Sequence, residues 1–200
     1  EDRKPHERHV QAVREWLEAA GHPAADWLGA PAAALGRALL APGRCVVMGD
    51  LWPASILPAD DGCFLIDWEF VHYGRPLQDV AHLAAHLWMQ AHRAPTPAIA
   101  HAFGQGLAAF LESYAAGISA IPDLFDAAEL QDGGVHAGCE LLARALGPFA
   151  AGFLHDGVGP DHPALEEVVA TAVRQLASDD GGELLAPLRS ALRPRARGAA

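Results

Sequence analysis

The stretch MGDLWPASILPADDGCFLIDWEFVHYGRPLQDVAHL (48–83) decides the fold, because short apolar runs alternate in it with acids and turn residues. The overlapping run CVVM (45–48) is apolar and β-branched, which predicts a short buried strand. Two more strands are predicted at SIL (55–57) and CFLI (63–66). PADDG (58–62) between them contains the Pro, Asp and Gly typical of a turn, so we expect a hairpin with acids near its ends.

Helical patterns fill most of the chain outside this stretch. Apolar residues from Val10 to Ala20 recur at helical spacing, and Gly21 ends that pattern. The Ala-rich composition favours helix, so we expect an α+β fold that is predominantly α. Further helices are predicted over 31–40, from Leu77 onward, over 97–116, from about Asp123 towards Phe153 with a weak point at Gly133 and Gly134, over 160–178 and over 184–192.

Composition excludes some classes of partner. The chain has 14 Lys and Arg against 25 Asp and Glu, a formal net charge of −11, which argues against binding to nucleic acid. An acidic protein attracts cationic substrates, although acidity that only keeps the chain soluble explains the same number. Cys45, Cys63 and Cys139 are dispersed thiols, which predicts a reduced, cytoplasmic protein. No apolar run is long enough to span a membrane, and no signal peptide opens the chain.

The acids of the central stretch suggest a chemical site. Asp50 follows the first predicted strand, and Asp67 and Glu69 follow the third, so the hairpin would bring them to one cleft near Ser55. Crowded carboxylates repel each other unless a cation is present, and hard oxygen ligands suit Mg²⁺. We assign Asp50 as a base and Ser55, Asp67 and Glu69 as metal ligands. The alternative is a hairpin whose acids are simply solvated.

Residues 48–83 resemble the catalytic core of the aminoglycoside phosphotransferase and choline kinase-like superfamily. That core reads H-G-D-x-x-x-x-N, a hairpin, [IV]-D-[WFP]-E, [YF]-G and a helix starting D-[LVI]-A. The segments GDLxxxSI and DxEF are also similar to methylthioribose kinases. The matching positions are Gly49, Asp50, Ile66, Asp67, Trp68, Glu69, Tyr73, Gly74, Asp79, Val80 and Ala81.

The resemblance implies an ATP- and Mg²⁺-dependent transfer of phosphate to a hydroxyl of a small molecule that is aminoglycoside-, choline- or thiosugar-like. Asp50 would be the catalytic base, and Asp67 would hold Mg²⁺ with help from Ser55 and Glu69. Asp79 would brace the catalytic loop, in which Met48 and Gly49 also have a supporting role. Two positions depart from the family: Met48 replaces a supporting His, and Ser55 replaces an Asn ligand.

The chain lacks the parts that cover ATP in kinase-like folds. Its one lysine, Lys4, precedes every predicted strand, and FGQG (103–106) and GVGP (157–160) look like breaks rather than phosphate loops. We therefore expect a kinase-like C-terminal lobe with the N-terminal ATP lobe absent, either truncated or on a missing segment. The isolated chain would be a weak enzyme or inactive. The alternative is a non-catalytic kinase-like module for binding or scaffolding.

The expected single domain, 1–200, divides by these roles. The boundaries are a helical lead-in over 1–44, the catalytic and metal-binding segment over 45–83, a helical subdomain over 84–192 and a tail over 193–200. The tail contains the small basic cluster RPRAR (193–197), which we read as a loose end.

Several further residues have two readings. Trp52 and His72 are candidates for substrate contact, with packing as the alternative for Trp52. His82 and His86 share a helix face, but zinc would need a third protein ligand that no motif supplies, so we read them as core or surface residues. Helical acids could line an acceptor pocket or form a solvated face: Glu112, Asp123, Asp126 and Glu140.

Overall fold

The computed structural model describes residues 5–147, 149–159 and 162–192. The chain begins with two helices that pack against each other, α1 (Pro5–Ala19) and α2 (Ala25–Leu40). Gly21 lies between them with a φ of +63°, a conformation that glycine adopts without strain. Helix α2 starts well before the predicted position, because Pro31 lies inside the helix rather than at its start.

Two small antiparallel sheets follow. The predicted hairpin is confirmed: β2 (Ile56–Ala59) pairs with β3 (Gly62–Leu65). The first strand, β1 (Cys45–Val47), pairs with β4 (His72–Gly74), a strand that the sequence did not predict. Val47 is buried as expected, but Val46 on the opposite face is 57% exposed, so the prediction of a fully buried strand was wrong.

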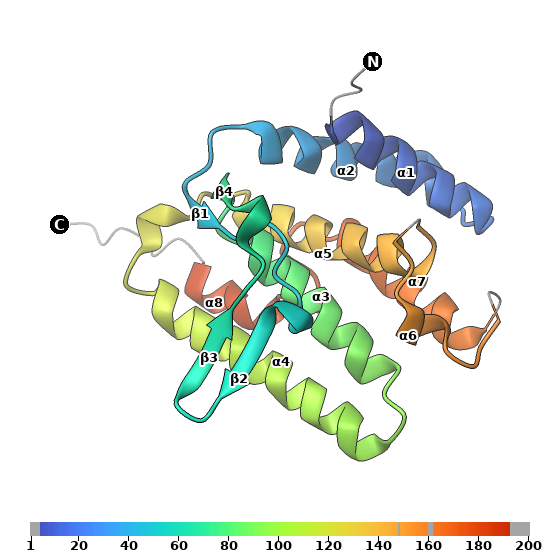
Figure 1. The fold of residues 1–200 in the computed structure, drawn as a ribbon. Coiled ribbons are helices and arrows are strands. Elements are labelled where there is room, and N and C mark those ends of the chain that lie inside the picture. Colours follow the sequence, from blue (N-terminus) through green and yellow to red (C-terminus); the bar gives the residue numbers. More distant parts are fainter. Residues whose placement is uncertain (1–4, 148, 160–161, 193–200) are drawn as a thin grey trace.

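Helices form the body of the molecule, as Figure 1 shows. Helix α3 (Gln78–His92) packs against both α4 (Pro97–Ile118) and α5 (Glu129–Ala145), and α5 packs against α7 (Pro163–Leu176). The prediction of a predominantly helical α+β fold is therefore confirmed. The short elements are η1 (Pro53–Ser55), η2 (Trp68–Phe70), η3 (Pro122–Leu124), α6 (Gly152–His155), η4 (Ala186–Leu188) and α8 (Arg189–Leu192).

The core lies between these helices. It is built mostly from leucine and alanine, and apolar residues of α1, α2, α3, α5 and α7 contribute to one continuous cluster. Its fully buried large side chains include Leu17, Leu28, Leu77, Met89, Leu111, Leu141, Leu142 and Leu176. Since α3 runs through the middle of this packing, its N-terminal residues have a rigid base.

Some predicted helix boundaries were wrong. The helix expected from Asp123 towards Phe153 is divided into η3, α5 and α6. Gly133 and Gly134 are no weak point, because α5 is continuous and both glycines are buried. Helix α3 crosses the expected boundary between residues 83 and 84. Lys4, the tail over 193–200 and its RPRAR cluster lie outside the described residues.

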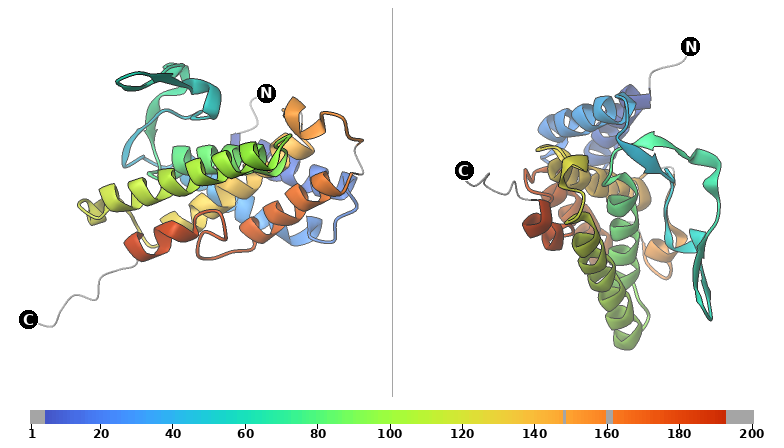
Figure 2. Two further views of the ribbon diagram at one scale, coloured as in Figure 1. Left: turned by 90° about the horizontal axis from the view of Figure 1, so that it is seen from below. Right: turned by 90° about the vertical axis from the view of Figure 1, so that its left-hand side faces the viewer.

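The β2–β3 hairpin stands away from the helical body (Figure 2). Large apolar side chains are exposed along the hairpin and the adjoining strands β1 and β4. The most exposed of them are Val46, Phe64, Phe70 and Tyr73. Among the residues that the structure describes, no helix combines the length and the apolar character that crossing a membrane requires.

Candidate active site

Asp79 holds the loop that connects β1 to η1. Its carboxylate accepts hydrogen bonds from the backbone N–H of Met48 (2.6 Å) and of Gly49 (2.9 Å). Asp79 lies in the first turn of α3, so the rigid helix fixes the loop through two charge-assisted bonds. The side chain of Met48 is buried and adds apolar packing at the position where the family has His.

Gly49 allows two segments to approach each other. Its φ is +90°, and a Cβ at this position would lie 2.6 Å from the carbonyl oxygen of Phe70. Only glycine fits such a close backbone approach. The loop over 48–50 therefore lies directly against the η2 turn, which follows the hairpin and begins after Asp67.

Asp50 lies at the junction between this loop and α3. Its side chain is about one third exposed, at 35%, and its Oδ1 is 3.2 Å from Nε2 of the buried His82. The carboxylate is thus anchored on one side and reaches solvent on the other. A general base needs both features, because it must be oriented and must still meet its substrate.

Ser55 ties the loop to the hairpin. It is only 1% exposed, and its hydroxyl lies 3.5 Å from the carbonyl oxygen of Asp50, to which it donates. Its own carbonyl oxygen accepts from the N–H of Ile66 (3.0 Å). The described contacts of Ser55 are therefore structural, and its assignment as a metal ligand stays a prediction.

Asp67 and Glu69 are exposed residues at the η2 turn. Among the described residues, Asp67 is the one non-glycine with a positive φ, at 72° with ψ of 51°. Such a conformation costs energy and is concentrated at functional sites. The Trp68 indole N–H donates to the carbonyl oxygen of Leu65 (2.8 Å), which fixes the turn. Two exposed carboxylates on a fixed turn have the chemistry of a Mg²⁺ site.

The two candidates for substrate contact come from different segments, Trp52 from the loop before η1 and His72 from β4. Trp52 is partly exposed, and its ring centroid is 5.9 Å from that of His86. His72 is exposed, and its Nδ1 lies 2.8 Å from the carbonyl oxygen of Phe70 in η2. Their contact with a substrate stays a prediction.

His82, His86 and Glu140 form a buried polar cluster behind Asp50. Nε2 of His86 lies 3.0 Å from Oε1 of Glu140, and Nε2 of His82 lies 3.6 Å from the same oxygen. Arg144 also contacts that oxygen. The histidines are core residues as predicted, but their third polar partner, Glu140, was missed because it is 58 residues from His82 in the sequence and reaches it through the packing of α5 on α3.

Burial and charge shift the pKa values in this cluster. Burial lowers the pKa of His82, although the charges of Glu140 and Asp50 act in the opposite direction. Burial alone would raise the pKa of Glu140, but the hydrogen bond with His86 and the charges of His82 and Arg144 hold it well below its usual range. At neutral pH, the cluster therefore combines neutral His82 with an ionised carboxylate.

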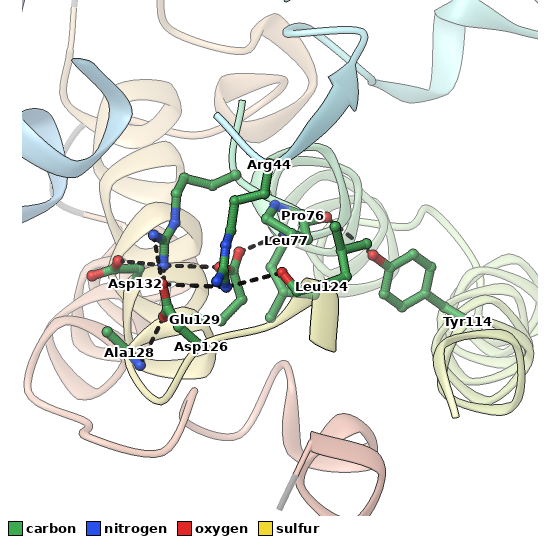
Figure 3. A network of polar contacts seen from close by, with 10 residues as sticks. Arg44, Pro76, Leu77, Tyr114, Leu124, Asp126, Ala128, Glu129 and Asp132 are labelled. Carbon is green, nitrogen blue, oxygen red and sulfur yellow. Dashed lines mark hydrogen bonds and ion pairs between the residues drawn. The ribbon is translucent and has the colours of Figure 1, made fainter. Parts of the chain in front are cut away.

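An ion network around Arg75 holds the residues that lead into α3 (Figure 3). The guanidinium of Arg75 contacts three acids of the α5 region: Asp126 (3.0 Å), Glu129 (2.8 Å) and Asp132 (3.2 Å). Burial opposes ionisation of Arg75, but the hydrogen bond and charges of these acids raise its pKa. Arg44 is a second cation near Asp126.

Backbone contacts extend this network to the first turn of α3. Glu129 is buried and accepts from the N–H of Leu77 (2.9 Å), and the Tyr114 hydroxyl of α4 donates to the carbonyl oxygen of Pro76 (3.0 Å). Helices α4 and α5 thus hold residues 75–77, which lead directly into Asp79. This connection positions the loop that carries Asp50.

The helical acids divide into two groups. Glu112 and Asp123 are exposed, which agrees with a solvated face. Asp126 and Glu140 are engaged with Arg75 and with the histidine cluster, respectively. Sequence periodicity could not separate these groups, because their partners are distant in the chain.

A family model described as "Phosphotransferase enzyme family" matches residues 1–118. This match covers more than half of the chain and includes Asp50, Ser55, Asp67, Glu69 and Asp79, whereas the acids of the α5 region lie beyond it. The chain therefore belongs to the phosphotransferase enzyme family, within the superfamily that includes aminoglycoside phosphotransferases and choline kinase-like proteins. Among curated proteins, no match was found.

Proposed function

We propose that the chain is the large lobe of an ATP- and Mg²⁺-dependent kinase that phosphorylates a hydroxyl of a small molecule. Family membership supports a phosphotransferase, and the loop geometry supports the roles of individual residues. The observation that carries the proposal is the pair of bonds from Met48 and Gly49 to Asp79, together with the close approach of Gly49, the neighbour of Asp50, to the η2 turn that follows Asp67.

Each residue has a role in this proposal. Asp50 orients the acceptor hydroxyl and receives its proton, while His82 restrains the Asp50 carboxylate from the helix side. Asp67 and Glu69 offer exposed carboxylate oxygens that would hold Mg²⁺, with Ser55 as a further candidate. When bound, Mg²⁺ neutralises charge on the phosphates of ATP.

The acceptor is proposed to be cationic or sugar-like. The Asp50 carboxylate and the exposed part of the Trp52 ring lie on the same loop, and this pairing suits a cation with an apolar body. The negative formal charge of the whole chain would attract such a substrate. Aminoglycoside-, choline- and thiosugar-like alcohols all remain within this class.

The exposed apolar face of the hairpin supports the existence of a second lobe. Phe64 of β3, Phe70 of η2 and Tyr73 of β4 are each more than half exposed, and exposed large apolar side chains that gather on one surface usually mark an interaction site. We propose that an N-terminal ATP lobe on the parent polypeptide covers this face. Without it, nucleotide affinity of residues 1–200 alone is expected to be low.

The experiment is a kinetic comparison in the full polypeptide that contains these residues. Phosphate transfer from ATP to a panel of amino sugars, amino alcohols and thiosugars is followed with Mg²⁺ present. We expect Asp50→Asn to lower kcat by about 10²–10⁴-fold, the range for loss of a general base. The matched control is Asp60→Asn, which changes an exposed carboxylate at the hairpin turn and should leave kcat unchanged.

A non-catalytic kinase-like binding or scaffold module is the second candidate. The buried hydroxyl of Ser55 favours it, because this side chain is occupied with the Asp50 carbonyl oxygen. Nucleotide binding without transfer to any acceptor, equal in wild type and Asp50→Asn, would support this candidate and contradict the catalytic one.

A further inference from the structure

The buried cluster behind Asp50 has the donor set of a transition-metal site. His82 and His86 are one turn apart on α3, and Glu140 reaches them from α5. One ligand atom from each of the three residues lies within 4.8 Å of the other two. Two imidazoles and a carboxylate are a common zinc-binding set, whereas Mg²⁺ prefers oxygen donors alone.

The spacing of the donor atoms fits tetrahedral zinc. With bonds of about 2.1 Å, ligand atoms in such a site lie about 3.4 Å apart. Oε1 of Glu140 is 3.0 Å from Nε2 of His86 and 3.6 Å from Nε2 of His82. Asp50 borders this set, because its Oδ1 is 3.2 Å from Nε2 of His82, but it is not one of the three residues whose donor atoms all lie within 4.8 Å of one another.

One nitrogen of the cluster has no hydrogen bond of its own. The side chain of His82 is only 9% exposed, and its Nε2 approaches two carboxylates without making a hydrogen bond to either. A buried polar atom without a hydrogen bond costs free energy. A metal ion bound between His82, His86 and Glu140 would accept the lone pair of this His82 nitrogen.

The surroundings of the cluster fit a metal site as well. Arg144 contacts Glu140 and can orient its carboxylate, a task that neighbours of metal ligands commonly perform. The ring of Trp52 lies beside His86, with the two ring centroids 5.9 Å apart. Asp50 is 35% exposed, so an ion can reach the cluster from the solvent side of this residue.

We propose that His82, His86 and Glu140 bind one zinc ion as its three protein ligands, with water in the fourth position. This site is distinct from the Mg²⁺ site assigned to Asp67 and Glu69, since it uses nitrogen donors and lies on the helix side of Asp50.

Direct binding is measured on residues 1–200 after removal of metals with a chelator. Calorimetric titration with ZnCl₂ should show one site, and CoCl₂ should give the intense visible absorption of tetrahedral Co²⁺. Excess MgCl₂ should not displace either ion. Absence of zinc binding, or Co²⁺ spectra of a six-coordinate aquo ion, would overturn the proposal.

Variants locate the site. His86→Gln and Glu140→Gln each remove a ligand, so each should weaken zinc binding by more than the roughly 10–100-fold that loss of a supporting residue costs. His101→Gln is the matched control, because His101 is an exposed histidine on α4. Zinc affinity that is equal in His86→Gln, Glu140→Gln and the control refutes the assignment.

A further measurement needs no variant and therefore holds even if a substitution impairs folding. X-ray absorption of the zinc-loaded chain should show two imidazole nitrogens with oxygen donors, and sulfur coordination or a single imidazole would contradict the site. The zinc titration and the X-ray absorption measurement do not involve ATP. A chain that binds zinc here but transfers no phosphate would therefore refute the proposed function and leave the zinc site intact.

Discussion

At the scale of single residues, Asp79 has the clearest structural task. One carboxylate satisfies two backbone donors, of Met48 and Gly49, at the point where the chain leaves β1. These bonds connect the N-terminal turn of α3 to the loop that carries Asp50. The direction of the Asp50 side chain therefore depends on Asp79, although the two carboxylates have different roles.

Asp79→Asn tests this dependence. The amide keeps one acceptor and turns an NH₂ group towards a backbone donor, so we expect the free energy of unfolding to fall by about 1–3 kcal/mol. Urea unfolding followed by circular dichroism measures the change. Asp60→Asn, in the exposed hairpin turn, is the control and should be neutral. Equal stability of wild type and Asp79→Asn would show that the loop does not need these bonds.

The sequence was informative about residues whose spacing is local. The order of Gly49, Asp50, Asp67 and Asp79 predicted a common site, and the structure places the loop, the turn and the helix start together. It could not predict that Glu140 joins His82, because an unbroken run of helix gives no information on which face of α5 meets α3. Packing between distant helices decides that contact.

At the scale of elements, α5 combines tight packing with an ion network. Gly134 lies against the loop after α7, where a Cβ would come within 2.8 Å of the Gly181 Cα. Gly104 in α4 has open space around its Cα hydrogen atoms instead. Close packing therefore requires a glycine at position 134, whereas a larger side chain has room at position 104.

Alanine substitutions at these positions should change stability in opposite directions. Gly134→Ala forces α5 from its neighbour and should cost about 1–3 kcal/mol. Gly104→Ala should add about 0.5–1 kcal/mol, since it only restricts the unfolded chain in a helix interior. Thermal unfolding of both variants measures the effects. A Gly134→Ala protein as stable as wild type would contradict the packing described for α5.

Glu129, in the first turn of α5, gives a prediction about pH. Burial raises the pKa of its carboxyl, and Asp126 and Asp132 raise it further, against the hydrogen bond from Leu77 and the charge of Arg75. In the folded chain this carboxyl therefore keeps its proton to a higher pH than in the unfolded chain, where its pKa is about 4.3. Its contribution to stability therefore falls as the pH rises through the folded-state pKa.

Comparison with Glu129→Gln isolates this effect, because glutamine does not titrate. The free energy of unfolding of the wild type should exceed that of the variant by more near about pH 4 than near about pH 7. Urea titrations of both proteins at several pH values provide the measurement. If the difference instead grows with pH, the carboxyl is stabilised in its ionised form and the sign assigned here is wrong.

Local patterns predicted some elements well and others poorly. The turn residues between Pro58 and Gly62 specified the β2–β3 hairpin, since Pro, Asp and Gly favour such a turn. Strand β4 is only three residues long and is stabilised by pairing with β1, so no periodic pattern could predict it. Pro31 was read as a helix start because proline favours that position, although α2 contains it.

At the scale of the whole molecule, a helical body supports a site at the base of an extended hairpin (Figure 2). The network of Arg75 fixes the start of α3 against α4 and α5, and α3 fixes the loop of Asp50. Exposed large apolar side chains lie along the hairpin and the neighbouring segments β1, η2 and β4. The sequence predicts a separate nucleotide lobe, and the exposed apolar side chains that we propose it covers became apparent only in the structure.

The central claim is that the turn after β3 holds the magnesium nucleotide. The most direct measurement is Mg²⁺-dependent phosphate transfer from ATP by the full polypeptide, compared between wild type, Asp67→Asn and the control Asp60→Asn. We predict that Asp67→Asn abolishes transfer and that raising the Mg²⁺ concentration recovers little of it, while Asp60→Asn retains wild-type turnover. Undiminished turnover in Asp67→Asn, at every Mg²⁺ concentration, would contradict the claim.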